Sequence, residues 1–213
     1  MDTRPALDAL VERAAALAPS SGRAVLGIAG LPGAGKTTVA LALVDGLAAR
    51  LGPDQVAHVP MDGFHLADVQ LERLGLRAVK GAPETFDAAG YAATLDRLRT
   101  GGDGVVYAPG FERGLEQPIA AAVAVPPAVR VVVTEGNYLL LDDPAWAAPR
   151  ASLAEVWRVD VDDDVRLRRL VARHVEFGKT PATARAWVER SDEANAALLR
   201  SRSIEPDLVV SLR

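Results

Sequence analysis

The sequence predicts an α/β fold in which a parallel sheet is sandwiched between helices. Short continuous apolar runs of strand length alternate along the chain with longer segments whose apolar residues recur at helical spacing. Such runs are typical of strands buried on both faces, as the strands of parallel sheets are. A glycine-rich turn also joins the first predicted strand directly to a helix.

The first half of the chain supplies two strands and several helices. An amphipathic helix is expected at 4–18, and the apolar run AVLGIA predicts a strand at 24–29. The helix expected at 36–50 places three apolar side chains on one face, and a second strand is expected at 55–60. Further helices are expected at 66–75 and 88–101, and a short strand or extended edge at 104–111.

The second half contains the strongest candidate for a central strand. This candidate is the segment VRVVVTEGNYLLL at 129–141, and a further strand is expected at 155–161. An arginine-rich helix is expected at 164–178, and a long helix with a proline near its start at 181–201. The segment DLVVSL at 207–212 predicts the last strand.

Length and composition limit the possible classes of protein. The chain has 213 residues, a net charge of −4 and no cysteine. We expect a single domain over residues 1–213, with a small helical segment at about 164–182, called the lid below. The negative charge disfavours nucleic acid as a partner, and the lack of cysteine excludes disulfides and thiolate metal sites.

The apolar segments indicate where the protein acts. No apolar run reaches membrane-spanning length, and the N-terminus lacks the uninterrupted apolar stretch of a secretory signal. We therefore expect a cytoplasmic protein with no membrane partner. Its oligomeric state is left open, a homodimer included.

The turn GLPGAGKTT at 30–38 matches the pattern G-x-x-x-x-G-K-[ST] between a strand and a helix. Glycines allow backbone N–H groups to turn inward around an anion, and the helix N-terminus adds partial positive charge. Lys36 is expected to reach the outer phosphates, and Thr37 to offer its hydroxyl to Mg²⁺. The sequence thus predicts a site for a nucleoside triphosphate.

Such a loop does not choose a function by itself, because GTPase switches, motors, transporters and small-molecule kinases all use it. The sequence contains no N-K-x-D or T-K-x-D guanine reader and no L-S-G-G-Q transporter signature. We weigh a small-molecule kinase against a regulatory NTPase that acts as a switch on a partner protein and against a nucleotide-binding module that has lost catalysis.

Two carboxylates follow predicted strands directly. Asp62 lies just past the second strand and Glu135 ends the central one. Ligands of such sheets lie beyond the carboxyl ends of the strands, so both side chains are candidates for the site. Asp62 either accepts the proton of an acceptor hydroxyl or caps a turn before Gly63. Glu135 either helps to hold Mg²⁺ or is an ordinary turn residue.

The lid presents Arg166, Arg169 and Arg173 on one helix face. Clustered guanidinium groups suit a phosphate in transfer. The alternative is a solvated basic face that pairs with the aspartates at 162–164.

These motifs together resemble the P-loop kinase superfamily of uridine kinase, phosphoribulokinase and type I pantothenate kinase. MDGFHL at 61–66 is similar to the T-D-G-F and D-S-F-Y stretches of those enzymes, and KGAPETFD at 80–87 to a K-G-x-P-E-S-Y-D stretch. TEGNYLLL at 134–141 resembles their E-G strand end. The resemblance covers about 24–210 and is closest to bacterial nucleoside/nucleotide-kinase-like proteins, some labelled fructokinase.

The resemblance implies an ATP-dependent kinase that phosphorylates an alcohol group of a small molecule and uses Mg²⁺. It implies Asp62 as the base, Glu135 as a residue that places Mg²⁺, and Arg169 and Arg173 as catalytic lid residues beside Lys36. The phosphates would be cradled by Gly33, Ala34, Gly35, Lys36, Thr37 and Thr38. The lid departs from the uridine kinase pattern, since Arg173-His174 stands where many of those enzymes have R-D.

The acceptor is expected to be a nucleoside, a sugar such as fructose, or a pantothenate-like alcohol. Phe111 offers a flat apolar surface, and Arg113 either binds an anionic group of the acceptor or forms a loop ion pair with Glu112 or a neighbour. His65 and Asp87 either bind hydroxyls or cap loops.

Overall fold

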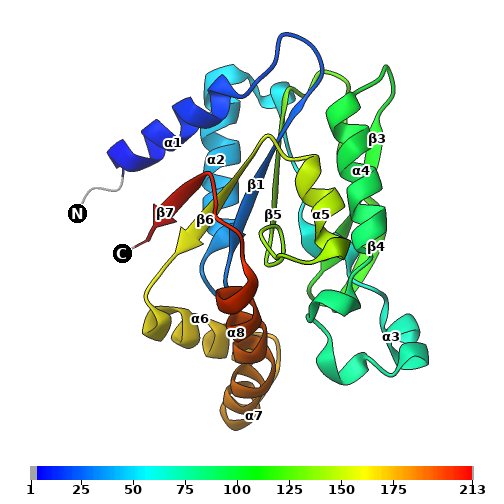
Figure 1. Ribbon diagram of the computed structural model, residues 1–213, viewed down its shortest axis with the longest axis vertical. Coiled ribbons are helices and arrows are strands. Elements are labelled where there is room, and N and C mark those ends of the chain that lie inside the picture. The colour runs from blue at the N-terminus through cyan, green and yellow to red at the C-terminus, as the bar shows by residue number, and fades with distance from the viewer. Residues whose placement is uncertain (1–3, 213) are drawn as a thin grey trace.

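A computed structural model describes residues 4–212 and confirms the predicted α/β fold. Five parallel strands form one sheet in the order β2-β5-β1-β6-β7, with β1 at its centre (Figure 1). The strands are β1 Ala24–Gly30, β2 Val56–His58, β5 Val131–Gly136, β6 Glu155–Asp160 and β7 Leu208–Ser211. Every residue of β1 and β5 is buried, as the continuous apolar runs indicate.

Helices cover both faces of the sheet. One face packs on α1 (Arg4–Ala16) and α2 (Lys36–Leu51), and the other on α4 (Ala88–Thr100), α5 (Pro144–Ala151) and α8 (Glu193–Arg202). Two separate apolar cores result, one on each side of β1 and β5. Within residues 4–212, no helix combines the length and the apolar character needed to cross a bilayer.

The edge strand β2 is shorter than predicted. It covers three residues, although the backbone N–H of Val59 still donates to the carbonyl of Val133. Pro60 has no N–H to continue the ladder, so the chain leaves the sheet there and enters a 3₁₀ turn, Met61–Phe64.

A two-stranded antiparallel sheet lies beside the main one and was only half predicted. It pairs β3 (Val106–Glu112) with β4 (Gln117–Val125), and α3 (Asp68–Leu74) lies nearby. The strand β4 escapes prediction because four of its nine residues are alanine and most of its side chains are exposed. It therefore lacks the alternation that marks a half-buried strand.

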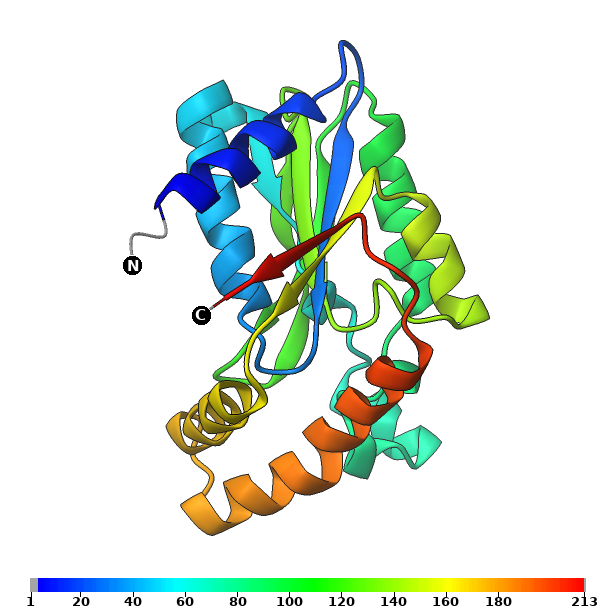
Figure 2. The same cartoon turned by 60° about the vertical axis from the view of Figure 1, so that its left-hand side comes forward.

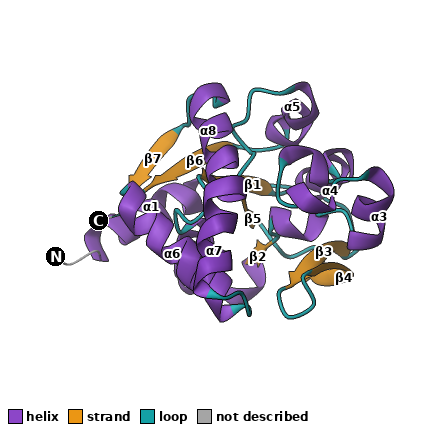
Figure 3. Cartoon of the chain, turned by 90° about the horizontal axis from the view of Figure 1, so that it is seen from below, coloured by secondary structure: helices purple, strands orange, loops and turns teal. Residues whose placement is uncertain are grey.

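The lid and the C-terminal helices lie beyond the carboxyl ends of the strands, below the sheet in Figure 2 and nearest the viewer in Figure 3. The first of these helices is α6, Asp163–Glu176. The long helix predicted at 181–201 is interrupted: α7 (Pro181–Trp187) and α8 are joined by a π-helical turn, Val188–Asp192. Such turns insert one extra residue and occur frequently at functional sites.

Candidate active site

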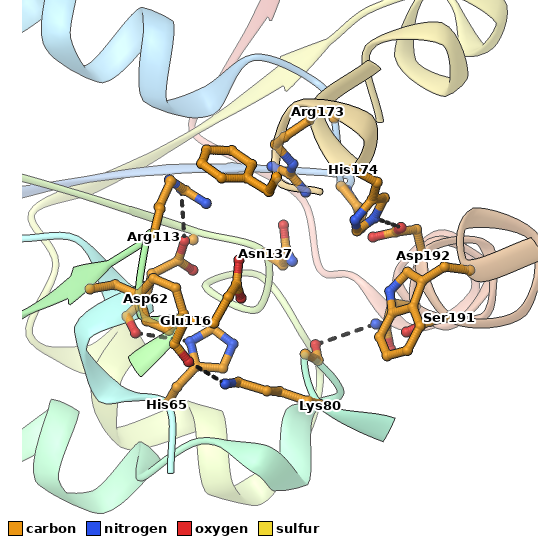
Figure 4. A pocket seen from close by; sticks show the side chains of 18 of the residues that line it. Asp62, His65, Lys80, Arg113, Glu116, Asn137, Arg173, His174, Ser191 and Asp192 are labelled. Carbon is orange, nitrogen blue, oxygen red and sulfur yellow. Dashed lines mark hydrogen bonds and ion pairs between the residues drawn. The ribbon is translucent and has the colours of Figure 1, made fainter. Parts of the chain in front are cut away.

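A cavity of about 390 Å³ opens at the carboxyl ends of β1 and β5. One wall comes from the turn at 30–38 and the start of α2, and another from α6, α7 and the π-helical turn. The third, called the acceptor wall, is formed by His65, Arg77, Lys80, Phe86, Phe111, Arg113 and Glu116. Figure 4 labels four of them: His65, Lys80, Arg113 and Glu116. The volume is in the range of small-molecule sites.

The glycine-rich turn has the backbone of an anion cradle. Gly33 and Gly35 have φ angles of 79° and 93°, which residues other than glycine adopt only with strain. The N-terminus of α2 has no side-chain cap, so its first N–H groups are directed toward the cavity without a competing carboxylate or hydroxyl. These features suit phosphate oxygens.

Gly33 also permits the lid to lie directly on this turn. A Cβ atom at Gly33 would lie 2.7 Å from Cγ of Leu170 and 2.8 Å from the carbonyl oxygen of Arg166, both on α6. Contacts this short force backbone displacement, since one of the two partners is a main-chain atom. The close approach therefore requires glycine.

We expect Gly33→Ala to weaken ATP binding and to lower the free energy of unfolding by about 1–3 kcal/mol. Gly75→Ala is the matched control, because Gly75 has a φ of 71° but nothing within 4 Å of its added Cβ. The control variant should lose stability through strain alone and bind ATP normally, as isothermal titration would measure. Equal ATP affinity in the two variants would contradict this account.

Lys36 extends from the start of α2 and is buried, with only 8% of its surface exposed. Its ammonium group donates to the carbonyl of Leu31 at 3.0 Å. Burial lowers the pKa of Lys36 to about 8, although the carboxylates of Glu135 and Asp62 favour the charged form. A cation desolvated in this way interacts strongly with an incoming anion.

Glu135 lies beside Thr37 at the bottom of the cavity. The Thr37 hydroxyl donates to Oε1 of Glu135 at 3.2 Å. Burial, and secondly the charge of Asp62, raise the pKa of Glu135 to about 7. A carboxylate this poorly solvated is stabilised by an added cation, so the pair is suited to a divalent metal ion.

Asp62 lies in the 3₁₀ turn after β2, and its side chain is 31% exposed. Its carboxylate pairs with Nη2 of Arg113 at 3.3 Å rather than capping a backbone N–H of its own turn. It lines the same cavity as Lys36 and Glu135 (Figure 4). The structure therefore favours the cavity-facing alternative for Asp62.

Gly63 is required for close packing against β3, and not only for the turn itself. A Cβ atom there would overlap the carbonyl of Pro109, so the residue lets β3 approach the turn that carries Asp62. Arg113, which follows β3, reaches Asp62 through this contact, while Glu112 accepts from the N–H of Gly114. Of the alternatives left open for Arg113, the loop ion pair with Glu112 is not formed, and the structure has the pair with Asp62 instead.

The three lid arginines differ in their environments. Arg166 is 1% exposed and donates to Asp163, to the carbonyl of Pro32 and to Glu193, so it ties α6 to the turn and to α8. Nη1 of Arg169 would lie 3.4 Å from a Cβ atom on Gly35, and Arg173 lines the cavity. Arg169 is not among the residues that line the cavity, but its guanidinium group reaches the glycine-rich turn, so Arg169 and Arg173 remain the candidates for contact with a phosphate.

The predicted acceptor residues divide into two groups. His65, Phe111 and Arg113 line the cavity, and the His65 ring lies 3.9 Å from that of Phe86 between their centroids. Burial lowers the pKa of His65, so its ring is neutral at pH 7. Asp87 instead caps α4 by accepting from the N–H of Gly90 at 2.8 Å, and it is not among the residues that line the cavity.

Several cavity residues were not singled out from the sequence. His174 lies 2.9 Å from a carboxylate oxygen of Asp192, which joins α6 to the π-helical turn. Asn195 donates to the carbonyl of Gly81, which connects α8 to the acceptor wall. The K-G-x-P-E stretch was the signal for this part of the site, but its partner residues lie more than a hundred positions away.

The chain is similar to kinases along nearly its whole length. It is 32% identical over 209 residues to a Schizosaccharomyces pombe protein provisionally named a uridine kinase, covering 95% of this chain and 89% of that protein. It is 31% identical over 192 residues to an uncharacterized Escherichia coli K12 protein, covering 89% of this chain and 78% of the other. No family model matches the chain.

A solved structure is similar in both fold and sequence. A protein of Silicibacter sp. TM1040, provisionally named a fructose transport system kinase, has a TM-score of 0.87 and 35% identity. The match covers 96% of this chain and 98% of that one.

Proposed function

The chain belongs to the family of P-loop kinases that includes the uridine kinases, and from this premise we propose that it transfers the γ-phosphate of ATP to a hydroxyl of a small metabolite. The acceptor would be a nucleoside, a sugar or a pantothenate-like alcohol. The proposal includes Mg²⁺ as the metal and residues 1–213 as a single domain with a lid.

One observation carries this proposal. The phosphate-facing Lys36 and the carboxylate of Asp62 line a single cavity, and they interact electrostatically across it. A switch NTPase needs a residue that orients water, whereas a carboxylate opposite the phosphate site suits an acceptor hydroxyl. The arrangement therefore favours transfer over hydrolysis.

The donor set fits magnesium. Mg²⁺ prefers oxygen ligands and is usually held by one or two side chains, waters and substrate phosphates. The Thr37 hydroxyl and the Glu135 carboxylate, 3.2 Å apart, supply two such oxygens at the start of α2. When bound there, the ion would neutralise charge on the phosphate oxygens during transfer.

The residues of the chain would divide the remaining work. Lys36 and the first N–H groups of α2 hold the phosphates, while Asp62 accepts the proton of the attacking hydroxyl. The new bond forms between the acceptor oxygen and the γ-phosphorus as the bond to the β,γ-bridging oxygen breaks. ADP leaves with the electron pair of that bond, and the proton remains on Asp62 until product release.

Arg169 and Arg173 would stabilise the charge that develops on the transferred phosphoryl group. We expect Arg169→Ala and Arg173→Ala each to lower kcat by about 10- to 10³-fold and to change the KM for ATP much less. Arg168→Ala is the matched control, since Arg168 lies on the same helix but neither lines the cavity nor comes within 4 Å of a Cβ atom on Gly35. If Arg169→Ala and Arg173→Ala both keep the wild-type kcat and KM, these arginines are only part of the solvated surface.

The proposed function is tested by measuring ADP formation with and without candidate acceptors. Nucleosides, hexoses, pentoses and pantothenate-like alcohols should be screened at fixed MgATP. We expect at least one of them to stimulate ADP formation well above the rate with ATP alone. Turnover that no acceptor changes would instead support a switch NTPase.

A further inference from the structure

The acceptor wall carries three basic side chains, Arg77, Lys80 and Arg113. In many sites such residues bind a carboxylate or phosphate of the substrate. Whether they do so here depends on whether their positive charges are already matched by the protein.

Lys80 and Arg77 share one carboxylate. Nζ of Lys80 lies 2.7 Å from Oδ1 of Asp68, and Nη2 of Arg77 lies 2.8 Å from Oδ2 of the same residue. The Lys80 side chain is only 9% exposed and also donates to the carbonyl of Glu116 (Figure 4). Asp68 therefore holds both cations in place and uses both of its oxygens to do so.

Arg113 is matched as well, because it pairs with Asp62 at 3.3 Å. Asp62 and Asp68 thus pair with all three cations of the wall, and Glu116 also lines the cavity. His65 adds no charge, since burial lowers its pKa. An anionic group of the acceptor would have to compete with these carboxylates for the three cations.

Beyond the acceptor wall, the cavity carries charged residues such as Arg173, Lys179 and Asp192, and also uncharged hydrogen-bonding groups. The uncharged groups belong to Asn137 after β5, Ser191 in the π-helical turn and Asn195 in α8. Figure 4 labels Asn137 and Ser191. Amide and hydroxyl groups both donate and accept, which matches the hydroxyls of a polyol without requiring a charge.

We propose that the acceptor is an uncharged polyhydroxylated compound, a free sugar or a nucleoside, and that Asp68 excludes anionic acceptors by holding Arg77 and Lys80. The inference rests on the proposed function and narrows its substrate class. It also separates this chain from kinases whose acceptors carry a carboxylate or a phosphate.

The test compares acceptors that differ mainly in charge, by acceptor-dependent ADP formation at fixed MgATP. The pairs are glycerol with glycerate, panthenol with pantothenate, and fructose with fructose 6-phosphate, and uridine distinguishes a nucleoside from a sugar. We expect kcat/KM for the better neutral acceptor to exceed that of its charged partner by at least about tenfold. A charged member preferred in its pair would overturn the inference and leave the proposed function standing.

The variant Asp68→Asn gives a second, independent arm. Asparagine keeps the size of the side chain but frees the charges of Arg77 and Lys80, so the preference should move toward the anionic member by at least about tenfold. Asp96→Asn is the control, since Asp96 pairs with Arg99 on α4 away from the cavity. A ratio unchanged in Asp68→Asn would overturn the role of Asp68. No stimulation by any compound, with ATP still bound, would overturn the proposed function itself.

Discussion

Replacing Lys36 with alanine is expected to lower phosphoryl transfer by at least about 10³-fold. A preorganised donor aimed at developing charge is commonly worth about 10²–10³ in kcat, and Lys36 adds a full positive charge in a buried position. The rate of acceptor-dependent ADP formation measures the effect. Turnover like that of the wild type would remove the turn at 30–38 from the mechanism.

The fold should survive this change. Burial lowers the pKa of Lys36 to about 8, so the charged side chain is not a net source of stability in the nucleotide-free protein. Lys36→Met, which keeps the apolar stem, should unfold at a temperature no lower than the wild type while remaining inactive. Loss of cooperative unfolding in both variants would mean that they are inactive because they do not fold.

Replacing Asp62 with asparagine is expected to lower acceptor-dependent turnover by about 10²–10⁴-fold, the usual contribution of a general base. The amide retains the size of the side chain but cannot accept the proton of the hydroxyl. ATP affinity should be unchanged, because the phosphates are held by the turn at 30–38 on the other side of the cavity. Parallel measurement of kcat and of the Kd for ATP separates these two expectations.

A second variant is the control for loss of the ion pair between Asp62 and Arg113. Arg113→Gln removes the pair of 3.3 Å but leaves the Asp62 carboxylate, so its loss of turnover should be much smaller than that of Asp62→Asn. Equal losses in the two variants would show that Asp62 acts by positioning rather than as a base. Glu135 would then be the next candidate for the base.

The sheet was predictable because the burial of its central strands is visible in the sequence as runs of apolar residues. The apolar runs at 24–29 and 129–141 correspond to β1 and β5, which are buried along their whole length. Their carboxyl ends then place Glu135 and the turn at 30–38 at one edge, and Asp62 follows from the neighbouring strand. Local sequence patterns are sufficient for these residues, because the position of each is fixed by the strand that carries or precedes it.

The acceptor end was less predictable, because its chemistry depends on pairs far apart in the chain. Arg113 reaches Asp62 across 51 positions, and His174 reaches Asp192 only because a π-helical turn interrupts the predicted helix. Asp68, which holds Lys80, looks in the sequence like an ordinary acidic residue at the start of a helix. No local sequence pattern identifies which carboxylate will pair with which basic side chain.

The three arginines of α6 illustrate the same limit. Their spacing predicted one shared helix face, but it could not tell which of them would be used internally. Arg166 is buried by Asp163, Pro32 and Glu193, two of which lie outside its own helix. The spacing alone would have assigned it the same role as Arg169 and Arg173.

The central claim is that the γ-phosphate of ATP is transferred to a hydroxyl and not to water. Mass spectrometry of the reaction with the best acceptor, alongside quantified ADP and free phosphate, tests it most directly. We expect one phosphorylated acceptor per ADP, with free phosphate remaining near the level seen without acceptor. Free phosphate equal to ADP, and an acceptor of unchanged mass, would contradict the account.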